Sequence, residues 1–148
     1  MKKIVLVASI FFISFSLLAM IPVKAQDTTE QIISTVDEIL AKNPLPAGQK
    51  AQLIKVAEDN TMTLFVLRAT EGFELKRHIH KTHDETVFVI KGAGQMLIHD
   101  KWADLKPGSI HFNPMGKVHA LKATGAEPLV GISIFTPALK EPDRHFLD

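Results

Sequence analysis

Cysteine and tyrosine are both absent from the 148-residue chain, and these two absences exclude several kinds of chemistry. Without cysteine, the protein forms no disulfide, no thiolate zinc site and no iron–sulfur cluster, and it has no thiol nucleophile. Without tyrosine, no reaction can use a phenol as its base. The sequence also lacks a phosphate-binding glycine loop and a serine-centred nucleophile elbow, so the chemistry must come from other side chains.

Residues 1–25 have the pattern of a secretory signal peptide. Two lysines precede an apolar run over residues 4–20, and small residues at Val23 and Ala25 suit a signal peptidase. Cleavage after Ala25 would export the protein to the periplasm or the medium, with no stable membrane association afterwards. An uncleaved anchor is the alternative, although a run of about 17 residues is at the short limit for crossing a bilayer.

Cleavage would also change the sign of the net charge. The precursor has 17 basic and 16 acidic residues and a formal charge of +1. Loss of Lys2, Lys3 and Lys24 leaves 14 basic residues against 16 acidic ones, a charge near −2. The mildly basic precursor therefore gives no reason to expect a nucleic-acid partner.

The segment before the main domain, residues 26–48, predicts a helix and a short linker. Apolar residues recur at helical intervals over residues 27–43, and Thr28 and Gln31 have the spacing of a capping box. Pro44 forbids continuation of the helix. We expect this helix to pack on the outside of the domain that follows.

Residues 49–137 predict one β domain, because short alternating runs are separated by glycine and proline turns. This pattern is typical of a closed barrel or a double-sheet jelly roll, and there is no internal repeat. The Lys91-Gly92-Ala93-Gly94 segment predicts a hairpin between residues 85–90 and 95–99. The single tryptophan, Trp102, is expected to serve packing, and residues 138–148 are expected to form an irregular tail.

His78, His80, Glu85 and His119 are the candidate metal ligands. Residues i and i+2 of a strand face the same side about 7 Å apart, so His78 and His80 can both approach one ion. Glu85 follows after a turn, and His119 would have to return from a distant strand. Three imidazoles and one carboxylate suit a divalent first-row transition metal ion, namely iron, manganese, nickel, cobalt or zinc.

Other polar residues in the same region are weaker candidates. Three further histidines are expected to be surface residues or neighbours of the ligands: His83, His99 and His111. Strand alternation puts His111 opposite Ile110 and Phe112, and it leaves open which of the two faces is inward. The same alternation would place Glu74 and Lys76 on the face of His78, where one of them could line a pocket, but a solvated position on the barrel rim is expected for both. His145, in the tail, is expected to be solvated.

The spacing of the candidate ligands resembles the two motifs of the cupin superfamily, G-x5-H-x-H-x3,4-E-x6-G and G-x5-P-x-G-x2-H-x3-N. The first motif is matched by Gly72, His78, His80, Glu85 and Gly92, and the second by Gly108, Pro114, Gly116 and His119. Ala123 replaces the final asparagine, which is not a metal ligand. The resemblance covers about residues 50–137 and implies a small single-domain cupin, a mainly β protein with a jelly-roll barrel.

The resemblance implies a metal-dependent enzyme of the dioxygenase, isomerase, epimerase or lyase type, acting on a small oxygen-bearing molecule. His78, His80 and His119 would hold the ion, and Glu85 would be the fourth ligand or a general base. The alternative is a non-catalytic module that binds a metal or a small ligand. Small cupins are commonly homodimers, so a homodimer is expected, with the N-terminal helix as one possible contact.

Overall fold

The structure, a computed structural model, describes residues 31–147, which contain one helix and ten strands. The predicted signal peptide and the Thr28 end of the predicted helix lie outside these residues. The elements are α1 (Val36–Lys42), β1 (Ala51–Glu58), β2 (Thr63–Ala69), β3 (Glu74–Ile79), β4 (Asp84–Lys91), β5 (Gly94–Ile98), β6 (Lys101–Leu105), β7 (Ile110–Asn113), β8 (His119–Ala123), β9 (Leu129–Thr136) and β10 (His145–Phe146).

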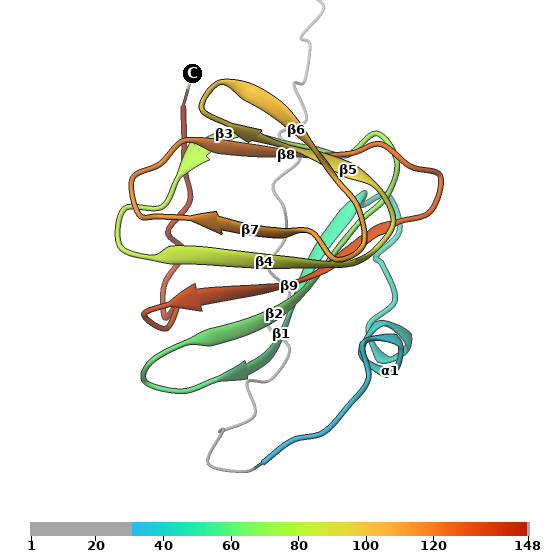
Figure 1. Cartoon of the computed structure of the whole chain (residues 1–148). Coiled ribbons are helices and arrows are strands. Elements are labelled where there is room, and N and C mark those ends of the chain that lie inside the picture. Colours follow the sequence, from blue (N-terminus) through green and yellow to red (C-terminus); the bar gives the residue numbers. More distant parts are fainter. Residues whose placement is uncertain (1–30, 148) are drawn as a thin grey trace, which may run out of the picture.

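The strands form two five-stranded antiparallel sheets that face each other (Figure 1). One sheet has the order β1-β2-β9-β4-β7, and the other has the order β10-β3-β8-β5-β6. Strands that follow one another in the chain often lie in different sheets, so the chain crosses repeatedly between the two layers. The predicted mainly β jelly-roll barrel is therefore confirmed.

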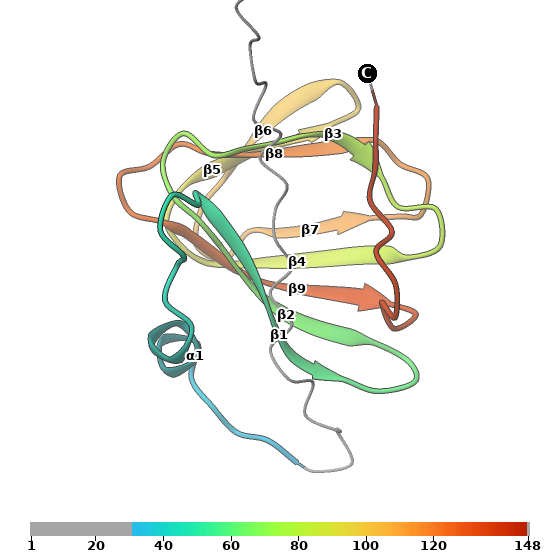
Figure 2. The ribbon, with the colours of Figure 1, turned by 180° about the vertical axis from the view of Figure 1, so that it is seen from behind.

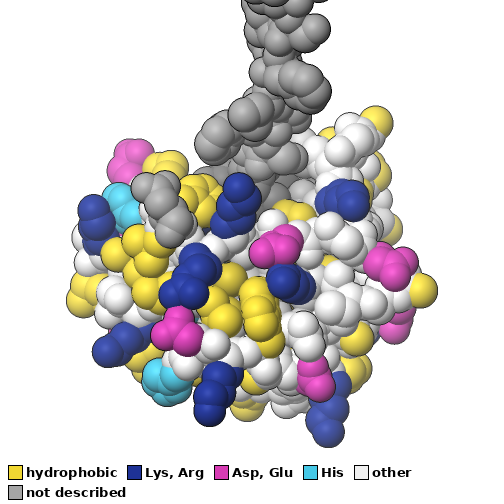
Figure 3. All heavy atoms as spheres, turned by 90° about the horizontal axis from the view of Figure 1, so that it is seen from above, with side chains coloured by type: hydrophobic (Ala, Val, Ile, Leu, Met, Phe, Trp, Pro, Cys, Tyr) yellow, Lys and Arg dark blue, Asp and Glu magenta, His cyan; other side chains and the backbone are white. Residues whose placement is uncertain are grey.

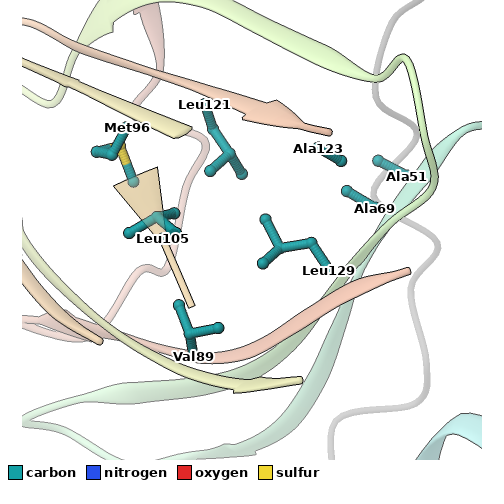
Figure 4. Close-up of a cluster of buried hydrophobic side chains, with 8 residues drawn as sticks. All are labelled: Ala51, Ala69, Val89, Met96, Leu105, Leu121, Ala123 and Leu129. Carbon is teal, nitrogen blue, oxygen red and sulfur yellow. The ribbon is translucent and has the colours of Figure 1, made fainter. Parts of the chain in front are cut away.

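Aliphatic side chains from both sheets fill one end of the barrel (Figure 4). The cluster is made of Ala51, Ala69, Val89, Met96, Leu105, Leu121, Ala123 and Leu129. Each of these residues is less than a tenth exposed. Burying such side chains contributes about 1.5–3 kcal/mol for each large aliphatic group, so this end provides much of the stability of the domain.

The other end of the barrel carries polar side chains on the same inward faces. Along β8, the inward positions are His119, Leu121 and Ala123, and all three are buried. Side chains two residues apart share a face of a strand, so the aliphatic core leads directly to the histidine. In the same way β4 continues inward from Val89 to Glu85. Packing of the aliphatic side chains thus helps to fix the strands that carry His119 and Glu85.

The helix α1 is shorter than predicted, because it begins at Val36 and residues 31–35 are not helical. The capping box lies at Thr35: its hydroxyl accepts from the Glu38 amide at 3.2 Å, and the Glu38 carboxylate accepts from the Thr35 amide at 2.9 Å. The apolar side of α1 packs against Ile54, Val66 and Val130, on the outside of the β1-β2-β9 sheet, as predicted. Within the described residues, no helix has the length and apolarity needed to cross a membrane.

The predicted hairpin at residues 91–94 was wrong, because β4 and β5 belong to different sheets. Gly92 makes this crossing possible: its φ is +78°, and a Cβ there would collide with the backbone of Pro128 and Leu129. The hairpin is formed instead by β5 and β6. His99 and Asp100, with φ values of 48° and 60°, form its two-residue turn.

Trp102 lies on the outer face of the β10-β3-β8-β5-β6 sheet. Seen from above, this face carries hydrophobic side chains among lysine and arginine side chains (Figure 3). The Lys122 ammonium group lies 4.2 Å from the centre of the Trp102 ring and also reaches Glu74 at 3.6 Å. These contacts agree with the expected packing role of Trp102.

The C-terminal segment is irregular between β9 and β10, as predicted, but it is tightly attached to the barrel. It runs from the end of β9 across the polar end of the barrel to β3, where β10 pairs with it (Figures 1 and 2). The Leu139 amide donates to the buried Thr63 hydroxyl at 2.8 Å, and the Lys140 ammonium contacts Glu58 at 3.0 Å. The segment therefore closes one side of the polar end.

Candidate metal centre

Three of the four predicted ligands converge at the polar end of the barrel. The ligand nitrogens of His78, His80 and His119 all lie within 4.8 Å of one another, and the side chains are 1%, 4% and 3% exposed. The ring centres of His78 and His119 are 4.1 Å apart, because the two residues are paired across β3 and β8. His80 follows directly after β3, and its ring lies 5.1 Å from that of His119.

An irregularity in β3 directs His78 into the barrel. The pairing between β3 and β8 shifts register between Leu75 and His78, so strict alternation is broken there. Leu75 packs against the aliphatic core and His78 is buried, although the two residues are an odd number of positions apart. Glu74 and Lys76 are exposed as a result. The expected solvated position of both residues is confirmed, whereas alternation alone would have placed them on the face of His78, because it assumes an undisturbed strand.

Each histidine of the cluster has one ring nitrogen fixed by a backbone carbonyl. The Nδ1 atoms of His78 and His119 lie 2.8 Å from the Lys76 carbonyl and 3.0 Å from the Lys117 carbonyl. The Nδ1 of His80 lies 2.5 Å from the Asp143 carbonyl. A carbonyl can only accept, so each Nδ1 carries the ring proton and each Nε2 is left with a free lone pair. This is the tautomer that binds a metal through Nε2.

Glu85 adjoins the cluster from the opposite sheet. Its Oε2 atom lies 3.6 Å from His80 Nε2 and 3.4 Å from His119 Nε2. Its Oε1 atom accepts a hydrogen bond of 2.6 Å from the Ser133 hydroxyl, which fixes the carboxylate. The Nε2 atoms of His80 and His119 are buried and have no hydrogen-bond partner among residues 31–147. Two lone pairs so close to a carboxylate oxygen repel it unless a cation, either a proton or a metal ion, binds among them.

The protonation states of the site favour a cationic guest. Burial and the neighbouring His119 lower the pKa of His78 to about 3, so this ring is neutral near pH 7. Burial alone would raise the pKa of Glu85, but positive charge shared with the facing His119 and His80 rings, together with the Ser133 hydroxyl, outweighs it and lowers the pKa well below its usual value. The site therefore contains an ionised carboxylate beside a neutral imidazole, a combination that attracts a cation.

These donors fit a divalent transition metal ion. Two atoms that each bind one metal at about 2.1 Å lie roughly 3.0–3.5 Å apart. The distances from Glu85 Oε2 to the two Nε2 atoms, 3.4 and 3.6 Å, are close to this range. Imidazole nitrogens with one carboxylate suit iron, manganese, cobalt, nickel or zinc. The cluster of three histidines could hold such an ion, with Glu85 next to it.

Asp143 supports the histidine cluster, although no sequence pattern indicated this role. Its carboxylate accepts from the backbone amides of Lys81 and Thr82 at 3.0 and 2.8 Å, and from the Thr82 hydroxyl at 2.8 Å. Its own carbonyl accepts from His80. A residue of the C-terminal segment thus fixes both the His80 ring and the turn that follows it. No motif spacing could indicate this role, because the two partners are 63 positions apart.

The remaining histidines have different surroundings. His83 is buried and directs its two ring nitrogens to the Asp143 carboxylate at 2.8 Å and the Ala138 carbonyl at 3.2 Å. His99 is exposed in its turn. His145 is partly exposed, and its Nε2 lies 3.1 Å from the Asp143 carboxylate. His111 points inward, which settles the question that the sequence left open. None of these four belongs to the three-histidine cluster.

Comparisons with known proteins agree with this geometry. Residues 65–135, which include all four predicted ligands, match the model of the cupin domain family. An uncharacterized protein of Aquifex aeolicus (strain VF5) is 30% identical over 108 residues, covering 72% of this chain and 85% of the relative. A glucose-6-phosphate isomerase of Thermococcus onnurineus (strain NA1) is 33% identical over 72 residues, but these cover only 44% of this chain and 38% of the isomerase.

A solved structure shares the fold at similar identity. It is an uncharacterized conserved protein with a double-stranded beta-helix domain from Klebsiella pneumoniae, 28% identical, with a TM-score of 0.63. The match covers 73% of this chain and 91% of that protein. The similarity thus extends over most of the described barrel.

Proposed function

The chain belongs to the cupin domain family, and we propose that it is a metal-dependent enzyme acting on a small oxygen-bearing molecule. His78, His80, His119 and Glu85 would hold one divalent first-row transition metal ion. The observation that carries this proposal is the set of three buried histidines with Nδ1 fixed by carbonyls and with two Nε2 atoms left unpaired against Glu85. A site without a guest would leave these buried groups unsatisfied, at a cost of about 1–3 kcal/mol each.

The residues around the ion define what the site can do. When bound, an ion of this kind acts as a Lewis acid that polarises a coordinated oxygen. Glu85 is held by Ser133, and its low pKa makes it a weak base, which supports the role of fourth ligand over that of a free general base. The Phe135 ring packs edge-on against His80 at 5.1 Å and limits access of water from that side.

The partial match to a protein named glucose-6-phosphate isomerase makes isomerisation of a hydroxy-carbonyl compound the first reaction to screen. If the ion is iron, oxygen consumption becomes the second screen. A protein that holds the ion firmly but turns over no compound in either screen would instead be a binding module.

Glu85→Gln is the variant that tests the proposal. We expect the untagged wild-type chain, purified without chelator, to contain about one equivalent of metal. We expect Glu85→Gln to bind the same metal roughly 10- to 100-fold more weakly, because the amide keeps the shape but loses the charge. The measurement is elemental analysis followed by competition with a chelator.

Glu74→Gln is the matched control, because Glu74 is an exposed carboxylate at the far end of β3. Its metal affinity should equal that of the wild type. A wild-type protein that takes up no metal even after reconstitution would refute the metal-dependent function. If Glu85→Gln keeps full metal affinity but loses turnover, Glu85 acts as a general base and is not a metal ligand.

We also propose that the protein is exported and cleaved after Ala25. The support is the charged start, the apolar run and the small residues before the cleavage position. The expected mature chain begins at Gln26, and N-terminal sequencing of the protein from the extracytoplasmic fraction would establish this. Recovery of the intact chain with the membranes would favour the anchor. The homodimer stays a prediction.

A further inference from the structure

His111 is a buried side chain that the proposed metal shell does not use. It is 5% exposed, and neither of its ring nitrogens has a hydrogen-bond partner among the described residues. The other inward histidines all have a partner for at least one nitrogen. Burying a polar group without a hydrogen bond is costly, so an unpaired imidazole at this position needs an explanation.

The position of His111 places it across the barrel from the histidine cluster. It lies on β7, at the edge of the sheet that also carries Glu85, and it pairs with Val87 of β4. The next inward residue of β7, Asn113, pairs with Glu85 itself. The His111 ring centre is 6.4 Å from that of His119, which belongs to the opposite sheet. His111 therefore lies beside the histidine cluster, on the sheet that carries Glu85.

His111 is placed to meet a ligand of the ion and is outside the metal shell itself. It does not belong to the group of histidines whose nitrogens lie within 4.8 Å of one another. The neighbours of His111 have other roles: His119 uses Nδ1 for the Lys117 carbonyl and has Nε2 beside Glu85, and Glu85 accepts from Ser133 and Asn113. A neutral imidazole offers one donor and one acceptor, which match a hydroxyl or carboxylate oxygen on a molecule bound between the two sheets.

Arg144 indicates the charge of such a molecule. Its Nε atom is buried and has no partner among residues 31–147, and it follows directly after Asp143, whose carbonyl holds His80. The nearby carboxylates are committed elsewhere, Asp143 to the amides of Lys81 and Thr82 and Glu85 to Ser133. A half-buried guanidinium group with no acidic partner among the described residues can bind an anion, and its planar donors match a carboxylate.

We propose that His111 binds the substrate directly, by a hydrogen bond to an oxygen of a small organic acid bound at the metal centre whose carboxylate is held by Arg144. This inference rests on the proposed function, because it needs an ion at the three histidines. It adds the substrate class, a hydroxy or oxo acid, and assigns a binding role to two residues outside the metal shell.

The test measures binding of two probes to the cobalt-loaded protein by its visible absorption. Glycolate, the smallest hydroxy acid, should contact both the ion and His111, whereas thiocyanate occupies one metal position and has no hydroxyl group. We expect His111→Phe to weaken glycolate binding about tenfold and to leave thiocyanate binding unchanged, since one hydrogen bond to a charged ligand is lost. His111→Gln should restore most of the affinity, and Arg144→Gln should weaken glycolate about tenfold.

Controls separate this inference from the metal-dependent function. His99→Asn removes an exposed histidine and keeps a residue that tolerates a positive φ, so it should bind both probes like the wild type. Unchanged glycolate affinity in a fully metallated His111→Phe protein would overturn the inference and leave the metal site intact. Loss of metal in His111→Gln would overturn it too, by making His111 a ligand. A wild-type chain that binds no cobalt would refute both proposals together.

Discussion

Replacing His119 with glutamine is expected to weaken binding of a divalent metal ion by at least about 100-fold, the upper limit for loss of a residue that only supports a ligand. His119 contributes a buried Nε2 that has no hydrogen-bond partner in the described part of the chain and lies 3.4 Å from Glu85. Glutamine has a similar volume but no imidazole lone pair. The ion would then keep two histidines and one carboxylate, and it would lose one of its four proposed protein ligands.

Thermal unfolding with and without added metal measures this effect. An ion that binds the native state stabilises it by about 2.7 kcal/mol at 100 times the dissociation constant, so the wild-type melting temperature should rise by several degrees. The melting temperature of His119→Gln should not respond to the same concentration. His99→Gln, an exposed histidine in a turn, is the control and should respond like the wild type. An equal metal-induced rise in all three proteins would show that the ion binds elsewhere.

Asp143→Ala is expected to cost about 2–4 kcal/mol of folding free energy and to weaken metal binding roughly 10- to 100-fold. The carboxylate is 6% exposed and accepts from two backbone amides, the Thr82 hydroxyl and His83. Alanine would leave these buried donors unpaired. Without the Asp143 carboxylate, the C-terminal segment is no longer hydrogen-bonded to the turn after His80. The Asp143 carbonyl that orients the His80 ring is then no longer fixed.

Asp59→Ala is a well-matched control for this variant. Asp59 also accepts from two backbone amides and a threonine hydroxyl, at 2.7 to 2.8 Å, but it is exposed and its carboxylate bonds only within its own turn. We expect a loss of about 1 kcal/mol, since water can satisfy the freed donors. Urea unfolding gives the two free energies, and chelator competition gives the two metal affinities. Equal effects of both variants on metal affinity would contradict a supporting role for Asp143.

Local patterns predicted the barrel and the histidine cluster because both depend on short-range regularities. His78 and His80 share a face over two positions, and the inward positions of β8 carry His119 and Leu121 in turn. The glycine and proline spacings marked the ends of the strands. Where the strand departs from regular alternation, as between Leu75 and His78, alternation no longer indicates which face Glu74 and Lys76 occupy.

Long-range contacts could not be predicted from the sequence. Asp143 lies in a polar, proline-containing segment whose composition predicts only an irregular tail, yet its carbonyl bonds to His80, because the segment leads into β10 beside β3. The segment around Gly92 has the residues of a hairpin turn, but it connects β4 to β5 in the other sheet. Its path depends on the close approach of the Gly92 backbone to the backbone of Pro128. His111 was ambiguous because either face of a short edge strand can be the inward one. In each case the deciding partner is remote in sequence.

The attachment of the C-terminal strand has a practical consequence for making the protein. The Phe146 ring lies 6.0 Å from the His78 ring, because β10 pairs with β3 at the position of this ligand. A polyhistidine tag fused after this strand would begin beside the three imidazoles and add six competing ones. Such a tag would inflate the apparent metal stoichiometry and strain the last hydrogen bonds of the barrel. A cleavable tag in front of α1, on the outer face of the opposite sheet, avoids both problems.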